Sequence, residues 1–261
     1  MKILFTKIIK ILLNYFKSFL RIFYKFQYDH VKFEKSQIDK FDSLGLDYKG
    51  GLEKLKKYLD VRDVTLSHHS ILFSSISLKR DNLSILEIGT HNAKNVQLLS
   101  QLYPKSKIIT IDLDEDDEKF ENFYNRSDFQ KKNNFCKLRD EILNKLTNAK
   151  FLNLNSVKLK QLDSKFDLIW IDGAHCYPEV AIDIMNSLNI INVNGMVICD
   201  DVYKKKFPLD EEMYISLATF QTLEILKKNN IIDYSLIHKR INVQYNSFPF
   251  DQKYIAIVKK L

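Results

Sequence analysis

The chain has 261 residues, of which 45% are hydrophobic and 28% are charged, values that are ordinary for a soluble globular protein. Its formal net charge is +7, but six basic residues precede the first acid, Asp29, so the rest of the chain is nearly neutral. This balance does not support a general affinity of the folded body for nucleic acid, and no such partner is expected. Cys136, Cys176 and Cys199 lack the spacing of a disulfide framework or a zinc site. They favour a reducing compartment, and we expect a cytoplasmic protein.

Residues 1–28 are predicted to form a basic amphipathic helix. Polar side chains recur there every three or four residues and line one helical face, with Ile, Leu and Phe around them: Lys7, Lys10, Asn14, Lys17, Arg21 and Lys25. These residues interrupt the apolar run too often for a spanning helix, and no secretory cleavage site follows. The pattern is typical of a helix lying on an anionic membrane surface, here the inner face of the membrane. The alternative is a helix packed on its own domain or on a second copy in a homodimer.

Residues 29–80 are predicted to hold a connector and a helical cap. The stretch 29–52 is polar and contains Gly45, Gly50 and Gly51, which is the composition of a connector. Helical patterns follow at 52–60 and 64–77. The chain therefore divides into an N-terminal helix (1–28), a connector with a helical cap (29–80) and a main domain (81–261).

The main domain alternates predicted strands with predicted helices. Nearly continuous apolar runs, typical of parallel strands buried on both faces, lie at 84–88, 107–112, 150–154, 167–171 and 195–200. Helices are predicted near 92–103, 135–147, 178–189 and 211–229, and two β-like runs end the chain at 234–241 and 253–261. This order predicts a Rossmann-like, doubly wound, seven-stranded and mostly parallel sheet that closes with an antiparallel pair.

The most informative segment is 84–114, which reads as strand, glycine turn, helix and strand. Glu87 precedes Gly89 at the first turn, and Asp112 ends the second strand. Gly89 indicates a backbone with unusual dihedrals or close approach of a ligand, and Asp112 is placed where a ribose is held in such folds. A dinucleotide fingerprint needs G-x-G-x-x-G, but His91 and Lys94 stand at its second and third glycines. The segment therefore predicts a nucleotide-type site that is not built for a pyrophosphate.

The pattern E-x-G-T with an acid-ended second strand resembles class I S-adenosylmethionine-dependent methyltransferases. The resemblance implies that the loop of Gly89, Thr90, His91, Asn92 and Ala93 approaches the methionine part of S-adenosylmethionine, with Glu87 before it. Asp112 is then the acceptor for both ribose hydroxyls, and Asp114, Glu115 and Asp116 are alternatives a few residues on. At the end of the third strand, Asn155 and Ser156 are the candidates beside the adenine, with a simple loop as the alternative.

Carboxylates follow two further strands of the predicted sheet. Asp172 ends the strand FDLIWI, and Asp200 and Asp201 end the strand MVIC. Strands of a parallel sheet carry their carboxyl ends to one edge, where ligands bind. Three clustered carboxylates repel one another, and a hard divalent cation such as Mg²⁺ relieves that repulsion. Successive strand residues face opposite sides, so Asp200 and Asp201 converge only if the strand has ended.

The phrases IDGAHCYPEV and NGMVICDD resemble the macrocin O-methyltransferase-like group of sugar- and polysaccharide-associated enzymes. The resemblance covers roughly residues 80–261 and implies that Asp172, Asp200 and Asp201 hold a metal that orients an acceptor hydroxyl of a glycan or small molecule. Asp172 also borders the cofactor. His175, three residues beyond it, has an ordinary pKa that suits a general base; alternatively its hydrogen bonds only brace the turn. Solvated or capping acids are the alternative to a metal.

Two other functions are compatible with the same sequence. One is a cephalosporin-hydroxylase-like enzyme of the same fold, and the other is a non-catalytic, membrane-associated binding subunit whose cofactor pocket has degenerated. His91 in place of the second glycine favours the latter. The charged segment 113–148, with Phe120, Phe123, Tyr124 and Phe129, is either a wall of the acceptor site or a solvated helical excursion. His68 and His69, on a helix before the first strand, are interpreted as structural.

Overall fold

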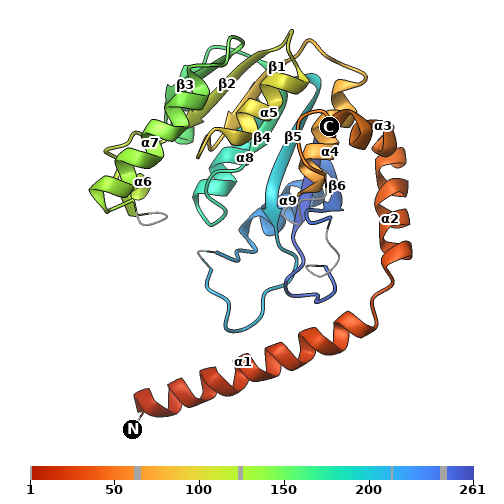
Figure 1. The fold of residues 1–261 in the computed structure, drawn as a ribbon, viewed down its shortest axis with the longest axis vertical. Coiled ribbons are helices and arrows are strands. Elements are labelled where there is room, and N and C mark those ends of the chain that lie inside the picture. Colours follow the sequence, from red (N-terminus) through yellow and green to blue (C-terminus); the bar gives the residue numbers. More distant parts are fainter. Residues whose placement is uncertain (1, 62–65, 123–125, 213, 242–245) are drawn as a thin grey trace.

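The computed structural model describes the chain apart from residues 1, 62–65, 123–125, 213 and 242–245; in the first helix it describes the side chains of Ile9 and residues 11–26. Seven strands form one sheet in the order β3-β2-β1-β4-β5-β7-β6 (Figure 1). In chain order the strands are β1 (Ser84–Ile88), β2 (Lys107–Asp112), β3 (Ala149–Asn153), β4 (Phe166–Ile171), β5 (Ile191–Val202), β6 (Ile232–His238) and β7 (Tyr254–Lys260). The first five pair in parallel, and β7 is antiparallel to both β5 and β6. The predicted sheet is confirmed.

Helices cover both faces of this sheet, as a doubly wound fold requires. One face is covered by α3 (Tyr48–Leu55), α4 (His68–Ser77), α5 (Lys94–Leu102) and α7 (Phe129–Leu143). The other is covered by α8 (Glu179–Ile190), α9 (Ala218–Lys228) and the short 3-10 helix η2 (Ser156–Gln161). Because strand residues alternate between faces, Ile85 and Trp170 enter the first core while Leu86 and Ile171 enter the second.

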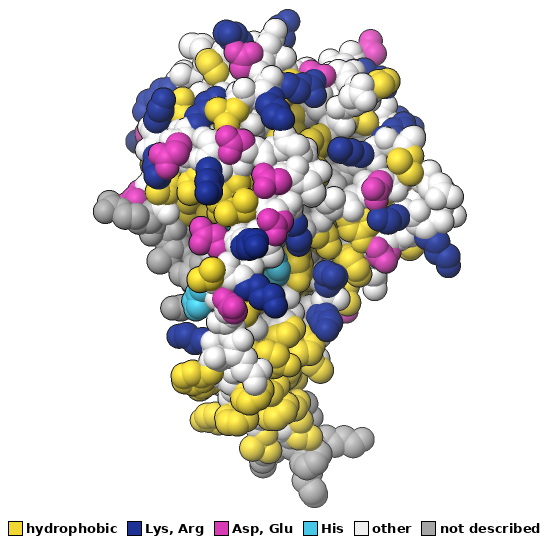
Figure 2. Space-filling view, turned by 90° about the vertical axis from the view of Figure 1, so that its right-hand side faces the viewer, with side chains coloured by type: hydrophobic (Ala, Val, Ile, Leu, Met, Phe, Trp, Pro, Cys, Tyr) yellow, Lys and Arg dark blue, Asp and Glu magenta, His cyan; other side chains and the backbone are white. Residues whose placement is uncertain are grey.

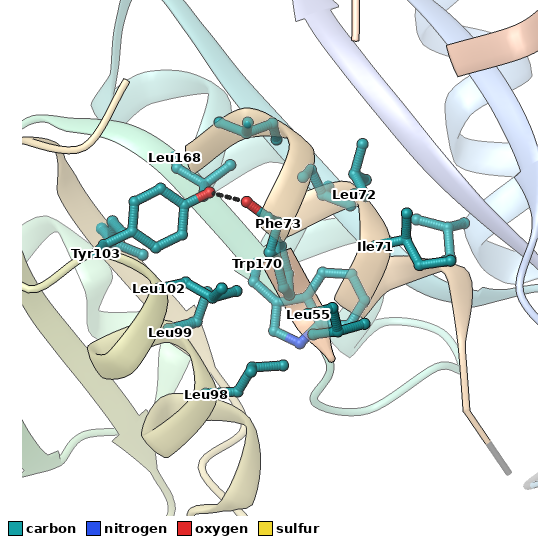
Figure 3. Packing of buried hydrophobic residues seen from close by; sticks show 14 of the residues in the cluster. Leu55, Ile71, Leu72, Phe73, Leu98, Leu99, Leu102, Tyr103, Leu168 and Trp170 are labelled. Atoms are coloured by element: carbon teal, nitrogen blue, oxygen red, sulfur yellow. Dashed lines mark hydrogen bonds between the residues drawn. The ribbon is translucent and has the colours of Figure 1, made fainter. Parts of the chain in front are cut away.

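Buried aromatic and leucine side chains join α4 and α5 to the sheet. Trp170 of β4 is fully buried and meets the Phe73 ring edge to face at 5.2 Å (Figure 3). The Tyr103 hydroxyl, also buried, donates a hydrogen bond to the Phe73 carbonyl oxygen over 2.6 Å. A buried phenol needs such a partner, because an unpaired hydroxyl away from water is costly. This packing fixes the first helices against the strands that carry the site.

The interpretation of residues 29–52 as a connector is wrong, because this stretch is largely helical. It contains α2 (His30–Ser43) and most of α3, each with an aspartate that caps the first turn, Asp29 and Asp47. Gly51 lies inside α3, where an added Cβ would stand 2.1 Å from the Ser75 hydroxyl of α4. The glycine therefore serves close helix packing and not a flexible turn.

The other predicted elements are found with shifted ends. The helix predicted at 64–77 is α4 from residue 68, and residues 62–65 lie outside the described part of the chain. The segment between β2 and β3 holds α6 (Glu118–Asn122) and a longer α7 than the predicted 135–147. The helix predicted at 211–229 is confined to α9. Strand β5 begins four residues before its prediction, at Ile191.

The N-terminal helix α1 (Lys2–Phe26) lies apart from the layers, beyond the carboxyl ends of the parallel strands (Figure 1). Two basic residues of its stripe contact the body of the protein: Lys17 pairs with Asp210, and Arg21 donates two hydrogen bonds to Asp251, over 2.6 and 2.9 Å. This part of the polar face of α1 is therefore packed on its own chain. Over the described residues, no helix is long and apolar enough to cross a membrane.

Candidate functional site

The loop after β1 has the backbone that a close-approaching ligand requires. Gly89 has a φ of +97°, and an added Cβ would stand 2.3 Å from the Asp172 carbonyl oxygen. His91 and Ala93 also have positive φ values, 46° and 61°. His91 thus keeps a conformation that glycine adopts most readily, although it carries a side chain. The turn into α5 therefore has positive φ at three positions, only one of which is a glycine.

Asp112 fixes this loop and keeps the capacity to bind a ligand. Its Oδ2 accepts the backbone N–H of His91 over 2.8 Å, and its Oδ1 accepts that of Leu113 over 2.8 Å. A carboxylate accepts about four hydrogen bonds, so about two sites remain for the ribose hydroxyls. The neighbouring acids make other contacts: Glu115 accepts a hydrogen bond from Arg139 over 2.5 Å, and Asp114 accepts the Asp116 N–H over 3.0 Å. Asp112 is the acid that the described hydrogen bonds tie to the loop after β1. Asp112 therefore remains the candidate ribose ligand.

Glu87 lies beneath the loop and not within reach of solvent. Its side chain is fully buried and accepts hydrogen bonds from the Thr110 hydroxyl over 2.5 Å and from the Asn95 amide over 2.8 Å. Burial raises the pKa of Glu87 to about 8, helped by the charges of Asp172 and Asp112 and opposed by the two hydrogen bonds. Glu87 therefore supports the loop by linking β1, β2 and α5.

The remaining predicted loop residues divide between structure and surface. Thr90 is buried, with its hydroxyl 2.6 Å from that of Thr110, whereas Asn92 lies at the loop surface and accepts the Lys94 N–H over 3.2 Å. The exposed His91 packs its ring against Phe135 of α7, with centroids 5.2 Å apart. Helix α7, in the segment 113–148, therefore borders the loop after β1.

Asn155 and Ser156 lie at the start of η2, after β3. The Asn155 side chain accepts the Val157 N–H over 3.0 Å and so caps this short helix. The Ser156 carbonyl oxygen accepts a hydrogen bond from Asn186 of α8 over 3.0 Å. Both follow the carboxyl end of β3, next to that of β2, which ends at Asp112. The described contacts show a capping role for Asn155 and a link to α8 for Ser156.

The predicted acids do converge at the carboxyl edge of the sheet. Asp201 has a φ of +48°, and the β5–β7 register shifts between Cys199 and Val202. A bulge of this kind ends the strict alternation of side chains. Asp200 and Asp201 therefore both reach the Nζ atom of Lys239, at 2.5 Å each. Although they are adjacent in the sequence, their side chains converge because the regular strand is interrupted between Cys199 and Val202.

The same arrangement does not fit the metal site predicted at Asp172, Asp200 and Asp201. Lys239 and Lys253 occupy three of the four carboxylate oxygens of Asp200 and Asp201. Within the described part of the chain, no three His, Cys, Asp or Glu side chains are arranged to hold a metal ion. The ammonium groups of the two lysines thus lie where Mg²⁺ was expected. Burial would raise the pKa of Asp201, but the charges of Lys239 and Lys253 lower it below its ordinary value.

The two candidate catalytic residues, Asp172 and His175, lie beside each other. His175 Nε2 lies 3.6 Å from Asp172 Oδ1, within the turn that follows β4. Burial, together with the charge of Asp200, raises the pKa of Asp172 to about 6. Burial alone would lower the pKa of His175, but the neighbouring carboxylate of Asp172, with the charges of Asp201 and Asp200, raises it above 6.5. The pair can hold or release a proton near neutral pH.

Sequence reasoning missed the lysines of this site. Lys239 directly follows β6, and Lys253 directly precedes β7. Nothing in their spacing in the sequence distinguishes them from surface lysines. His68 is structural, as interpreted: it is buried, and its ring Nδ1 lies 2.7 Å from the His238 carbonyl oxygen. His69 is half-buried, and desolvation lowers its pKa to about 4.

Comparisons with known proteins agree with this geometry. The methyltransferase domain family matches residues 86–202, whereas no curated protein sequence matches the chain. One similar solved structure is the O-methyltransferase TomG from Streptomyces achromogenes, involved in tomaymycin synthesis and in complex with SAM: 14% identity, TM-score 0.52, covering 89% of this chain and 99% of TomG. Another is an O-methyltransferase from Bacillus cereus in complex with SAH: 15% identity, TM-score 0.52, covering 89% and 100%. At these identities the likeness shows the fold. Residues 86–202 thus match a methyltransferase domain, and the chain has the fold of solved S-adenosylmethionine-dependent O-methyltransferases.

Proposed function

We propose that this methyltransferase methylates a hydroxyl group of a sugar, in a glycan or in a nucleotide- or lipid-linked precursor. The resemblance of residues 166–202 to sugar-associated O-methyltransferases supports a sugar acceptor. The two solved structures named above are O-methyltransferases by name, which supports oxygen as the methylated atom. The observation that carries the proposal is the contact between the loop after β1 (residues 89–93), where the cofactor would bind, and the turn that holds Asp172 and His175.

That contact is direct. The position of a Cβ on Gly89 would lie 2.3 Å from the Asp172 carbonyl oxygen and 3.0 Å from the Gly173 nitrogen. The Asp172 N–H in turn donates to the Ile88 carbonyl oxygen over 2.9 Å. A cofactor on the loop and an acceptor at His175 are therefore neighbours, and alignment of the two reactants is the main requirement of a single displacement.

S-adenosylmethionine supplies an activated methyl group on a sulfonium ion when it is bound. Asp112 would hold the ribose, and the left-handed turn from Gly89 to Ala93 lets the backbone approach the methionine part. The imidazole of His175 would take the proton of the acceptor hydroxyl, and Asp172 would orient the ring and stabilise its charged form. A pKa above 6.5 gives this imidazole the basicity for that proton.

Transfer of a labelled methyl group from S-adenosylmethionine to a set of acceptors tests this proposal. Nucleotide-linked and lipid-linked sugars are expected to be labelled by the wild-type chain, with the label lost in His175→Ala. Lys227→Met is a suitable control, because Lys227 lies on α9 in an exposed ion pair with Asp233. Labelling of amines but of no sugar hydroxyl would contradict the proposal. No labelling of any acceptor, with cofactor bound, would favour the cephalosporin-hydroxylase-like alternative.

The exposed face of α1 supports a membrane-linked acceptor. Lys17 and Arg21 are paired with acids of the body, whereas many apolar side chains of α1 are exposed: Ile9, Ile11, Leu12, Tyr15, Phe16, Phe19, Ile22, Phe23 and Phe26. Figure 2 shows hydrophobic side chains gathered at this end of the molecule. A helix whose exposed face is rich in aromatic residues and lacks acids suits insertion into the interfacial layer of a bilayer. Three free thiols favour the cytoplasmic side.

Vesicle flotation of the full chain tests this contact. Wild-type protein is expected to float with vesicles, including zwitterionic ones, because Lys17 and Arg21 are already paired with acids of the body. Phe16→Asp with Phe19→Asp should abolish flotation, whereas Val193→Asp, an exposed apolar residue of β5, should not. A wild-type chain that does not bind vesicles would contradict the membrane role. A wild-type homodimer that Phe19→Asp dissociates would also contradict it and would assign the exposed face of α1 to contact with a second copy.

A further inference from the structure

Two ammonium groups stand inside the acid cluster at the carboxyl edge of the sheet. Lys239 Nζ donates to Asp200 Oδ2 and Asp201 Oδ1, each over 2.5 Å, and Lys253 Nζ donates to Asp201 Oδ2 over 2.6 Å. The remaining oxygen, Asp200 Oδ1, is buried and has no hydrogen-bond partner among the described residues. The cluster is therefore neutralised from within and keeps one free acceptor.

Lys239 is held at this place by its backbone and not only by its charge. Its N–H donates to the Lys253 carbonyl oxygen over 2.8 Å, which ties the end of β6 to the residue before β7. Its carbonyl oxygen accepts the Ser67 hydroxyl over 3.0 Å and the His68 N–H over 2.8 Å at the start of α4. With 9% of the residue exposed, Lys239 lacks the freedom of a surface lysine.

We propose that Lys239 is a built-in cation that replaces the divalent metal at the acceptor site, so that Asp200 and Asp201 are positioned by an ammonium group. This rests on the proposed hydroxyl methylation. The two lysines bring the same total charge as Mg²⁺, and they occupy the oxygens that Mg²⁺ would coordinate at about 2.1 Å. An ammonium has three N–H donors, and carboxylates among the described residues use two of those on Lys239. The third is available to the oxygen of a bound acceptor.

The reaction then needs no metal. The carbon–sulfur bond of the sulfonium breaks as the bond from the acceptor oxygen to the methyl carbon forms, and S-adenosylhomocysteine leaves as a neutral thioether. The hydroxyl proton passes to His175, while Lys239 keeps its protons throughout. Lys239 is in this sense a positioning residue, because it holds the carboxylates and the acceptor oxygen without exchanging a proton or an electron pair.

The test combines manganese binding, measured by electron paramagnetic resonance, with kinetics of the full chain. Wild-type protein is expected to bind no Mn²⁺ at this site and to keep its turnover in a chelator. Lys239→Met should lower kcat/KM roughly tenfold or more, leave S-adenosylhomocysteine affinity unchanged, and gain Mn²⁺ binding as the carboxylates are freed. The control Lys227→Met, in an exposed ion pair, should change none of these.

Wild-type protein that binds Mn²⁺, with the signal lost in Asp200→Asn, would overturn the proposal, as would turnover that stops in chelator and returns with Mg²⁺. These wild-type measurements decide the matter even if Lys239→Met does not fold. A chain that binds no S-adenosylhomocysteine would instead refute the proposed function, so the two failures are distinguishable.

Discussion

Replacement of Gly89 by alanine should damage both stability and cofactor binding. Two independent costs follow from the structure. A φ of +97° is strained for any residue with a side chain, at about 1–3 kcal/mol. The new Cβ would also stand 2.3 Å from the Asp172 carbonyl oxygen, which is backbone and cannot rotate away. Relief of such an overlap costs roughly another 1–3 kcal/mol.

The sum, about 2–6 kcal/mol, corresponds to a fall in Tm of roughly 5–20 °C for a chain of this size. Any shift of the loop that relieves the overlap also moves the His91 N–H away from Asp112, so S-adenosylhomocysteine should bind at least about tenfold more weakly. Thermal unfolding and calorimetric titration measure the two effects separately.

Gly173→Ala is the matched control. Its Cβ would meet the Asp183 and Ile88 side chains at 3.5 Å, an ordinary contact, on the other side of the same junction. It should cost little in stability. If Gly89→Ala unfolds at the wild-type temperature and binds S-adenosylhomocysteine normally, the close approach of β1 and β4 at this loop does not exist as described.

Three further predictions concern charge. Asp112→Ala should weaken S-adenosylhomocysteine binding roughly tenfold or more, because hydrogen bonds to a carboxylate are lost; unchanged affinity would remove Asp112 from the ribose site. Since His175 must be neutral to accept a proton and its pKa is raised above 6.5, kcat/KM should rise with pH through that pKa, and a fall over the same range would contradict its role as base. Burial raises the pKa of Glu87 from 4.5 to about 8, so its proton stabilises the fold below pH 4.5 and that contribution is lost as pH rises to 8, by at most about 1.4 kcal/mol per unit. Glu87→Gln should flatten this loss of unfolding free energy, and parallel pH profiles for the two proteins would show that Glu87 does not titrate there.

Local patterns predicted the sheet well, because each buried strand is a short apolar run that ends at a glycine or a polar residue in the sequence. Gly89 and Asp112 mark the ends of β1 and β2 in the sequence and lie there in the structure. The stretch 29–52 was misinterpreted because the prediction used local patterns alone. Three glycines are locally typical of a connector, but Gly51 lies in a helix, where its lack of a side chain lets Ser75 of another helix pack closely.

Contacts between distant segments could not be predicted. Lys239 meets Asp200 across 39 positions of the chain, and no periodicity connects them. The bulge at Asp201 that brings both acids together depends on the register of β5 with β7. Likewise, the stripe on α1 was visible in the sequence, whereas its orientation depends on Asp210 and Asp251 in loops far away.

Calorimetric titration of the full, folded chain with S-adenosylhomocysteine is the most direct measurement of the cofactor site. One molecule is expected to bind per chain with an affinity tighter than high micromolar, and binding should weaken in Asp112→Ala. No heat of binding at high micromolar concentration, in protein whose circular dichroism shows it to be folded, would contradict the assignment of Gly89 and Asp112 to S-adenosylmethionine.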